Sequence, residues 1–315
     1  MFESVTGHVS TLGAFVRRRL PRPPEPASVE WGTTVDDPEV GAVQLTGELS
    51  RIGSEGLLIL LHGLGGSNDS LYVRSAANAA LARGLSVLRL NMRGADRECP
   101  DFYHAALTSD LHTTLQSTTL TDFERVYVLG FSLGGHVALR FVAESVDVRV
   151  RAVASACSPL DLARCADVMD RPSMGLYRSY MLRKLVEMFE VVAAHRAMPV
   201  SVEEVSRIRY MREWDERVVA PRHGFAGAAD YYDRASAGPC LSSIRTRTLV
   251  LAAENDPMIP AASLRPFMLA ARSPVEGRWV KRGGHLGFSS GFDLGQPGAK
   301  GFDEQILTWL LSPGG

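Results

Sequence analysis

The chain of 315 residues has few cysteines, no large excess of charge of either sign and no long apolar run. Its four cysteines, Cys99, Cys157, Cys165 and Cys240, form no CxxC pair and no zinc-type spacing. We therefore expect reduced, mostly buried thiols and no metal site. The formal net charge of −1 excludes the strongly basic surface that nucleic acids require. No apolar run reaches the length of about 18 residues that a membrane-spanning helix needs, so the sequence predicts no transmembrane helix.

The N-terminal segment also lacks the features of a secretory signal. Its first charge is acidic, the basic cluster at residues 17–19 comes late, and no apolar run follows that cluster. We therefore expect a cytoplasmic protein in which residues 1–30 form an N-terminal arm. An amphipathic helix near residues 9–20 is an alternative, so peripheral contact with a membrane surface stays open. The sequence does not indicate whether the protein is a monomer or an oligomer.

Short apolar runs typical of buried strands recur along the rest of the chain. Segments with helical periodicity separate most of them, such as residues 70–84, in which Gly84 marks the helix end. This alternation predicts a mainly parallel sheet flanked by helices, which is the α/β class. Residues 29–51 instead predict short antiparallel strands. The predicted buried strands are residues 57–61, 86–90, 125–130, 151–156, 247–252 and 277–282.

Residues 158–240 interrupt the alternation with three helical patterns, at 176–195, 201–218 and 226–236. A helical insertion between two strands predicts a cap over the carboxyl edge of the sheet, where open α/β sheets bind ligands. The alternative is a helical subdomain that only thickens the core. Likewise, Met188 and Phe189 belong either to an acyl-chain pocket or to the core, because helical periodicity does not separate these roles.

The expected organisation is therefore one integrated catalytic domain with an N-terminal arm. Residues 31–157 and 241–315 form its core, and residues 158–240 form its cap. Every candidate site residue outside the cap lies within four positions after the end of a predicted strand. Because the carboxyl ends of parallel strands meet at one edge of a sheet, we expect these residues to lie close together.

The stretch Gly130-Phe131-Ser132-Leu133-Gly134 lies between a predicted strand and a helical pattern. A tight strand-to-helix turn needs glycines two residues before and after the serine, because a Cβ there would clash across the turn. The serine then has a strained backbone and a projecting hydroxyl, and the helix N-terminus beside it can stabilise an anion. A glycine turn that merely ends the strand is the alternative. The position of the motif favours Ser132 as a nucleophile.

A nucleophilic serine needs a base, and that base needs an acid to orient it. Asp256 follows the predicted strand 247–252, and His285 lies in a glycine-rich loop after the last predicted strand. The order serine, acid, histidine is the one expected for this type of fold. We therefore predict a triad of Ser132, Asp256 and His285, with Glu254 as a competing acid.

The strand at residues 57–61 ends in His62-Gly63-Leu64-Gly65-Gly66. Such a turn lets backbone N–H groups face an oxygen that becomes negative during acyl transfer. We predict that the N–H groups of Leu64 and Leu133 form the oxyanion hole, and that His62 holds the turn. A glycine turn that only ends a strand is the alternative.

Together these motifs resemble those of the α/β hydrolases, within them the YheT-like branch, which includes animal membrane-associated lipases and plant embryogenesis-associated proteins. The resemblance runs from about Trp31 to the C-terminus. It rests also on the strings LNMRG at 90–94, YHAALTSDL at 103–111 and CSPLDL at 157–162. It implies the α/β-hydrolase fold, with Ser132, Asp256 and His285 at the triad positions of serine esterases and lipases.

The predicted function is hydrolysis of a small-molecule carboxylic (acyl) ester through an acyl-enzyme, without a metal or a cofactor. One alternative is an acyltransferase that uses the same triad with an alcohol or thiol in place of water. Another is a catalytically silent hydrolase fold that serves as a binding protein, against which the complete set of motifs argues.

Overall fold

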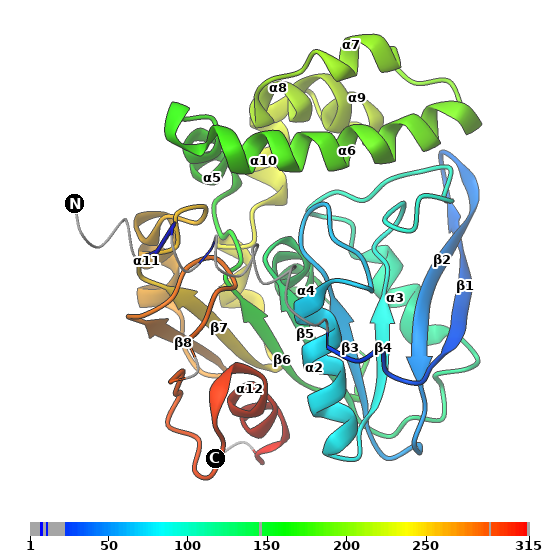
Figure 1. Cartoon of the computed structure of the whole chain (residues 1–315). Helices are drawn as coiled ribbons and strands as arrows, with labels where there is room; N and C mark the ends of the chain where they lie inside the picture. The colour runs from blue at the N-terminus through cyan, green and yellow to red at the C-terminus, as the bar shows by residue number, and fades with distance from the viewer. Residues whose placement is uncertain (1–6, 9–10, 12–22, 145–146, 290, 314–315) are drawn as a thin grey trace.

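The computed structural model describes residues 7–8, 11, 23–144, 147–289 and 291–313 (Figure 1). An eight-stranded sheet with the order β1-β2-β4-β3-β5-β6-β7-β8 runs through the chain. The pairs β1–β2 and β2–β4 are antiparallel and all other pairs are parallel, which confirms the predicted fold class. The strands are β1 Val29–Asp37, β2 Gly41–Ser50, β3 Leu57–Leu61, β4 Ser86–Leu90, β5 Val126–Phe131, β6 Val150–Ala156, β7 Arg247–Ala253 and β8 Val275–Val280.

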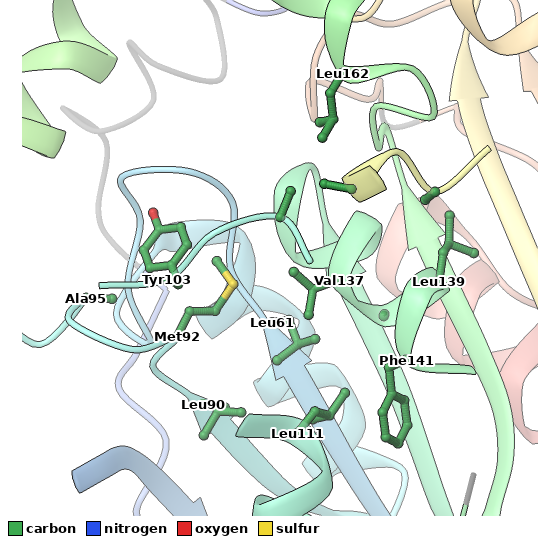
Figure 2. Packing of buried hydrophobic residues seen from close by; sticks show 14 of the residues in the cluster. Leu61, Leu90, Met92, Ala95, Tyr103, Leu111, Val137, Leu139, Phe141 and Leu162 are labelled. Atoms are coloured by element: carbon green, nitrogen blue, oxygen red, sulfur yellow. The ribbon is translucent and has the colours of Figure 1, made fainter. Parts of the chain in front are cut away.

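Helices cover both faces of this sheet. They are α2 Leu71–Ala82, α3 Ser109–Gln116, α4 Leu133–Ala143, α11 Ala261–Ala270 and α12 Gly301–Leu311. All five residues of β3 are buried, because its side chains alternate between two apolar layers. One layer contains α2 and α12, and the other contains α3, α4 and α11. Figure 2 shows Leu61, Leu90 and Leu111 in the second layer, beside Val137 and Phe141 of α4.

Residues 158–240 contain helices and no strand. The helices are α5 Leu162–Met169, η2 Pro172–Met174, α6 Gly175–His195, α7 Val202–Ser206, α8 Met211–Trp214, η3 Asp215–Val219, α9 Ala220–Arg222, α10 Ala228–Ala235 and η4 Pro239–Ser243. We call residues 158–240 the helical segment. Figure 1 shows α6 crossing one end of the sheet. An added Cβ at Gly65, in the loop after β3, would lie 2.9 Å from Cβ of Lys184 in α6. The helical segment therefore packs on a loop of the predicted site.

The helical pattern at 201–218 is divided into three shorter helical elements. Ser201 and Glu204 form a capping box that starts α7, which ends at Ser206. The backbone N–H groups of Met211 and Arg212 then donate to the Asp170 carboxylate, so a new helix starts there. The π-helical turn η3 follows directly.

Both ends of the helical segment contact one histidine of the sheet region. The ring of His136, on α4, is fully buried, and its two nitrogens lie 2.8 Å from the carbonyl oxygens of Pro159 and Ala235. Burial lowers the pKa of His136 to about 4, so the neutral ring donates to one of these carbonyls at a time. His136 thus joins the start and the end of the helical segment to the helix that follows Ser132.

A buried group of charges joins the same two regions. We call Arg93, Asp37, Asp101, Asp110 and Arg222 the charge cluster. The Arg93 guanidinium donates to the carboxylates of Asp37, Asp101 and Asp110 at 2.5 to 3.1 Å. Arg222 of α9 donates to both oxygens of Asp101 at 2.8 and 2.6 Å. Because each buried charge has a partner of opposite sign, the cluster fixes α9 against the sheet region.

Candidate active site

Ser132 lies at the sharp turn between β5 and α4. Its backbone has φ +53° and ψ −119°, a strained conformation for a residue with a side chain. Its N–H donates to the Ala156 carbonyl oxygen at 2.8 Å. A Cβ at Gly130 would overlap the Gly134 backbone, and a Cβ at Gly134 would overlap the His62 carbonyl oxygen. The turn therefore has room only for glycine at both positions, as the sequence indicates.

The three residues predicted as a triad lie together in the structure. His285 Nε2 is 2.9 Å from Ser132 Oγ, and His285 Nδ1 is 2.8 Å from Asp256 Oδ2. All three residues are buried, with exposed fractions of 7 to 9%. A neutral imidazole with its proton on Nδ1 donates to the carboxylate and accepts the serine hydroxyl proton at Nε2. This geometry is that of a base oriented by an acid.

The second oxygen of Asp256 is also engaged. Oδ1 accepts the backbone N–H groups of Met258 and Ile259 at 2.9 and 3.0 Å, so the carboxylate is held in its loop independently of His285. Glu254, the competing acid, is exposed, and its backbone N–H donates to the Val280 carbonyl oxygen. The structure therefore brings Asp256 to the histidine and leaves Glu254 at the surface.

The predicted oxyanion turn lies against the nucleophile, since an added Cβ at Gly63 would be 3.1 Å from Ser132 Cβ. Within this turn, the Gly63 N–H donates to the Tyr72 hydroxyl at 2.9 Å, and the Gly65 N–H donates to the Tyr103 hydroxyl at 2.8 Å. Over the described part of the chain, no residue accepts a hydrogen bond from the Leu64 N–H. Leu64 therefore keeps a backbone donor free beside Ser132.

The buried ring of His62 supports the same turn. Its Nε2 accepts the Met92 N–H at 3.1 Å, and its Nδ1–H donates to the Gly63 carbonyl oxygen at 2.8 Å. Burial lowers the pKa of His62 to about 4, so the ring is neutral at neutral pH and can accept at Nε2.

Leu133 is the first residue of α4, so its N–H is one of the free donors at a helix N-terminus. The tyrosine contacts to this turn have no sequence signal, because each spans at least nine positions.

The remaining groups to consider are possible metal ligands, the cysteines and the other histidines. The described residues include no group of three or more His, Cys, Asp or Glu side chains arranged to hold a metal ion. The four cysteines are free thiols, and burial raises the pKa of Cys157 well above its usual range. His104 contacts the ring of His223, with centroids 4.2 Å apart, and belongs to the packing of the helical segment. In the part of the chain that is described, no helix is long and apolar enough to span a membrane.

A family model described as the alpha/beta hydrolase fold matches residues 56–290, which is most of the chain. The chain belongs to the alpha/beta hydrolase family. Within this family it falls in the YheT-like branch. It is 30% identical over 248 residues to "Putative esterase YheT" of Escherichia coli (strain K12), covering 74% of this chain and 71% of the relative. Ser132, Asp256 and His285 all lie within residues 56–290, the region that the family model matches.

Two further comparisons extend this assignment. The chain is 26% identical over 262 residues to "Medium-chain fatty acid ethyl ester synthase/esterase 2" of Saccharomyces cerevisiae, covering 74% of this chain but 58% of that longer relative. The esterase Pf2001 of Pyrococcus furiosus matches in structure with a TM-score of 0.54 and 18% identity, over 83% of this chain and 85% of the esterase. The structural match shows a shared fold. Together, the hydrolase fold and the esterase-named relatives support a hydrolase that acts on esters.

Proposed function

We propose that the protein hydrolyses carboxylic esters, with Ser132 as nucleophile, His285 as general base and Asp256 as the acid that orients it. One observation carries this proposal: two hydrogen bonds, of 2.9 and 2.8 Å, link the serine hydroxyl through the imidazole to the carboxylate. The oriented imidazole can remove the hydroxyl proton as the nucleophile attacks, which activates an otherwise weak nucleophile.

In the acylation step, Ser132 Oγ attacks the ester carbonyl carbon and its proton moves to His285 Nε2. The Asp256 carboxylate stabilises the resulting imidazolium at Nδ1. The N–H groups of Leu64 and Leu133 stabilise the negative oxygen of the tetrahedral intermediate, and one such donor typically contributes about 3 to 4 kcal/mol. The intermediate then expels the alcohol, which takes the proton from Nε2, and leaves an acyl group on Ser132.

Deacylation uses the same groups in the same order. His285 Nε2 removes a proton from water as the water oxygen attacks the acyl carbonyl carbon. The bond between the acyl carbon and Ser132 Oγ then breaks, and the serine recovers the proton from Nε2. A carboxylic acid leaves, and the enzyme returns to its starting state without a metal or a cofactor.

The helical segment is the proposed cap over this site. Its helix α6 packs on the oxyanion turn through Lys184, and Tyr231 of α10 accepts the Ala105 N–H at 2.9 Å. These contacts put helices of the insertion on two loops at the carboxyl edge of the sheet. A small-molecule acyl ester is the proposed substrate, and the cap would exclude water from its acyl chain.

The experiment that tests this function is covalent labelling by a fluorophosphonate probe, with the modified residue located by mass spectrometry. We expect labelling on Ser132, and we expect the same protein to cleave nitrophenyl esters of increasing chain length. A Ser132→Ala variant is the control for both readouts. A wild-type protein that remains unlabelled and inactive, or a label on another residue, would contradict the proposal.

Acyl transfer is a second candidate, because the name of the yeast relative combines a synthase and an esterase. In that reaction an alcohol attacks the acyl-enzyme in place of water. Product analysis with added ethanol distinguishes the two, since a transferase forms the ethyl ester at the expense of the free acid. Equal yields of free acid with and without ethanol would argue for hydrolysis alone.

A further inference from the structure

Three described residues near the start of the chain contact the two loops that carry His285 and Asp256. We call Gly7, His8 and Thr11 the N-terminal anchor. All three have helical backbone. The Thr11 hydroxyl donates to the Gly7 carbonyl oxygen at 2.8 Å, and Thr11 is fully buried. A buried threonine far from the catalytic loops in sequence thus lies beside them in the structure.

The loop that carries His285 is a tight turn. Gly284 and Gly287 exchange two backbone hydrogen bonds, of 3.1 and 3.4 Å, and Leu286 has φ +55°. The backbone N–H of His285 is not part of this exchange. It donates instead to Thr11 Oγ1, at 2.8 Å and across 274 positions of the chain.

The Thr11 hydroxyl is oriented for this contact. Because its proton goes to the Gly7 carbonyl oxygen, a lone pair of the oxygen faces the His285 N–H. The fit leaves no space for other atoms, since a Cβ at Gly284 would overlap both Gly7 O and Thr11 Oγ1. The hydrogen bond therefore has one defined geometry.

The N-terminal anchor also touches the loop of the acid. A Cβ at Gly7 would overlap the carbonyl oxygen of Asn255, the residue before Asp256. The Asn255 side chain in turn donates to the Lys281 carbonyl oxygen, at 3.1 Å, in the loop that leads to His285. The anchor therefore packs where the acid loop and the histidine loop meet.

A third contact reaches the helical segment. The ring of His8 stacks on Tyr177 of α6, with centroids 5.8 Å apart, and His8 Nδ1 is 3.2 Å from the tyrosine hydroxyl. The anchor thus touches three separate parts of the molecule around the Ser132–His285 pair. A segment that only packed its own apolar surface would not need a hydrogen bond to the His285 backbone.

We infer that Thr11 is a positioning residue for the reaction, because its hydroxyl holds the His285 main chain and so sets the imidazole between Ser132 and Asp256. This inference rests on the proposed function of the triad. Without the hydroxyl, the buried His285 N–H loses its acceptor and the turn shifts to find another. A displacement of about 1 Å in a reacting group can lower the rate 10²-fold.

The test compares Thr11→Val, which removes the hydroxyl at nearly constant shape, with Thr11→Ser, which keeps it. Thr114→Val is the matched control, because Thr114 is also fully buried and donates to a carbonyl four residues earlier, that of Asp110 in α3. Gly7→Ala is a second route to the same defect, since its Cβ would push the anchor off Asn255. The measurements are kcat and KM on a short-chain nitrophenyl ester, the fluorophosphonate labelling rate and the pH dependence of kcat/KM. Rates are expressed per site that excess probe labels at the end point, so unfolded protein does not count.

We expect Thr11→Val and Gly7→Ala to lower kcat and the labelling rate by about ten- to a hundred-fold with KM unchanged. The pH profile of kcat/KM should shift in both variants, a change that lost stability alone does not produce. Thr11→Ser should restore the wild-type values, and Thr114→Val should keep them. The inference is overturned if Thr11→Val matches Thr114→Val, if Thr11→Ser is as slow as Thr11→Val, or if Gly7→Ala keeps wild-type rates when Thr11→Val yields no folded protein.

These outcomes are separate from a failure of the proposed function. If the wild-type protein takes no label on Ser132, the triad assignment fails, and the role of Thr11 fails with it. If Ser132 is labelled in the wild type at the same rate as in Thr11→Val and Gly7→Ala, the triad stands and the role of Thr11 alone is refuted.

Discussion

The sheet region and the helical segment position their side chains in different ways. In the sheet region, backbone contacts fix the candidate site: Ser132 takes a positive φ because Gly130 and Gly134 allow the turn, and backbone N–H groups hold Asp256. In the helical segment, side chains provide the order. Phe189 of α6, fully buried, meets Trp214 edge to face with ring centroids 6.2 Å apart. The candidate triad therefore lies on the part whose geometry is set by the backbone.

Two aspartates make the same contrast. Asp256 in the sheet region accepts two backbone N–H groups and one imidazole N–H. Asp215, at the start of η3, accepts the Tyr232 hydroxyl at 2.6 Å, and burial raises its pKa to about 7. One carboxylate is held by backbone and imidazole donors, whereas burial of the other favours its protonated, neutral form.

Among substitutions in the sheet region, Ser132→Ala should cause the largest loss of ester hydrolysis. We expect activity to fall on the order of 10⁶-fold, as for nucleophile loss in another serine hydrolase. The fold should persist, because alanine removes only the hydroxyl from the turn. Ester turnover and thermal melting by circular dichroism measure the two effects. Residual turnover well above that level in a clean preparation would show that Ser132 is not the nucleophile.

Asp256→Asn should have the next largest effect. An amide at this position cannot stabilise the imidazolium and favours the wrong tautomer of His285, and in a related triad the loss is about 10⁴-fold in kcat. Glu254→Gln is the matched control, because Glu254 is exposed and should leave kcat unchanged. An inactive Glu254→Gln beside an active Asp256→Asn would reverse the assignment of the acid.

In the helical segment, Phe189→Ala should act on stability. Loss of a fully buried phenyl ring lowers the free energy of unfolding by about 3 to 5 kcal/mol, and we expect no change in acyl-chain preference. Leu176→Ala, on the same helix and 69% exposed, should change neither. Urea unfolding and an ester panel test both variants. A shifted chain preference at full stability would place Phe189 in the pocket instead.

Asp215→Asn should change how stability depends on pH. Between its ordinary pKa of 3.8 and the folded value of about 7, Asp215 holds its proton in the folded state but not in the unfolded state. The unfolding free energy therefore falls as pH rises through this window, by on the order of a few kcal/mol. The amide variant should lack this decline. Parallel urea-unfolding series at several pH values test this, and identical slopes for the two proteins would refute it.

The sequence best predicts features that depend on residues close to one another in the chain, such as the bounds of buried strands. The bounds of β3 and β4 were predicted correctly because both strands are fully buried apolar runs. The position of β8 was off by two residues, because β8 is an edge strand with half-exposed and exposed side chains that do not mark its start. The amphipathic helix near residues 9–20, which is the alternative to an N-terminal arm, lies outside the described residues, apart from Thr11.

For the candidate site, each predicted residue lies within five positions after the end of a strand, so the order of strands and motifs indicated which residues would meet. The supporting groups had no such signal. Tyr72 and Tyr103 reach the oxyanion turn through their hydroxyls, and Thr11 reaches His285 across most of the chain. Such contacts depend on tertiary packing, which no local pattern encodes. The groups that hold the site therefore had to come from the structure.

The charge cluster has a consequence for the behaviour of the protein on heating. Removing charges from water costs less free energy as temperature rises, because the hydration of charged groups has a strongly negative entropy. The contacts of Arg222 with Asp101, and of Arg93 with its three carboxylates, therefore become relatively stronger at temperatures at which apolar packing gains nothing further. Heat inactivation should begin away from this junction, with α9 among the last parts of the helical segment to leave the sheet.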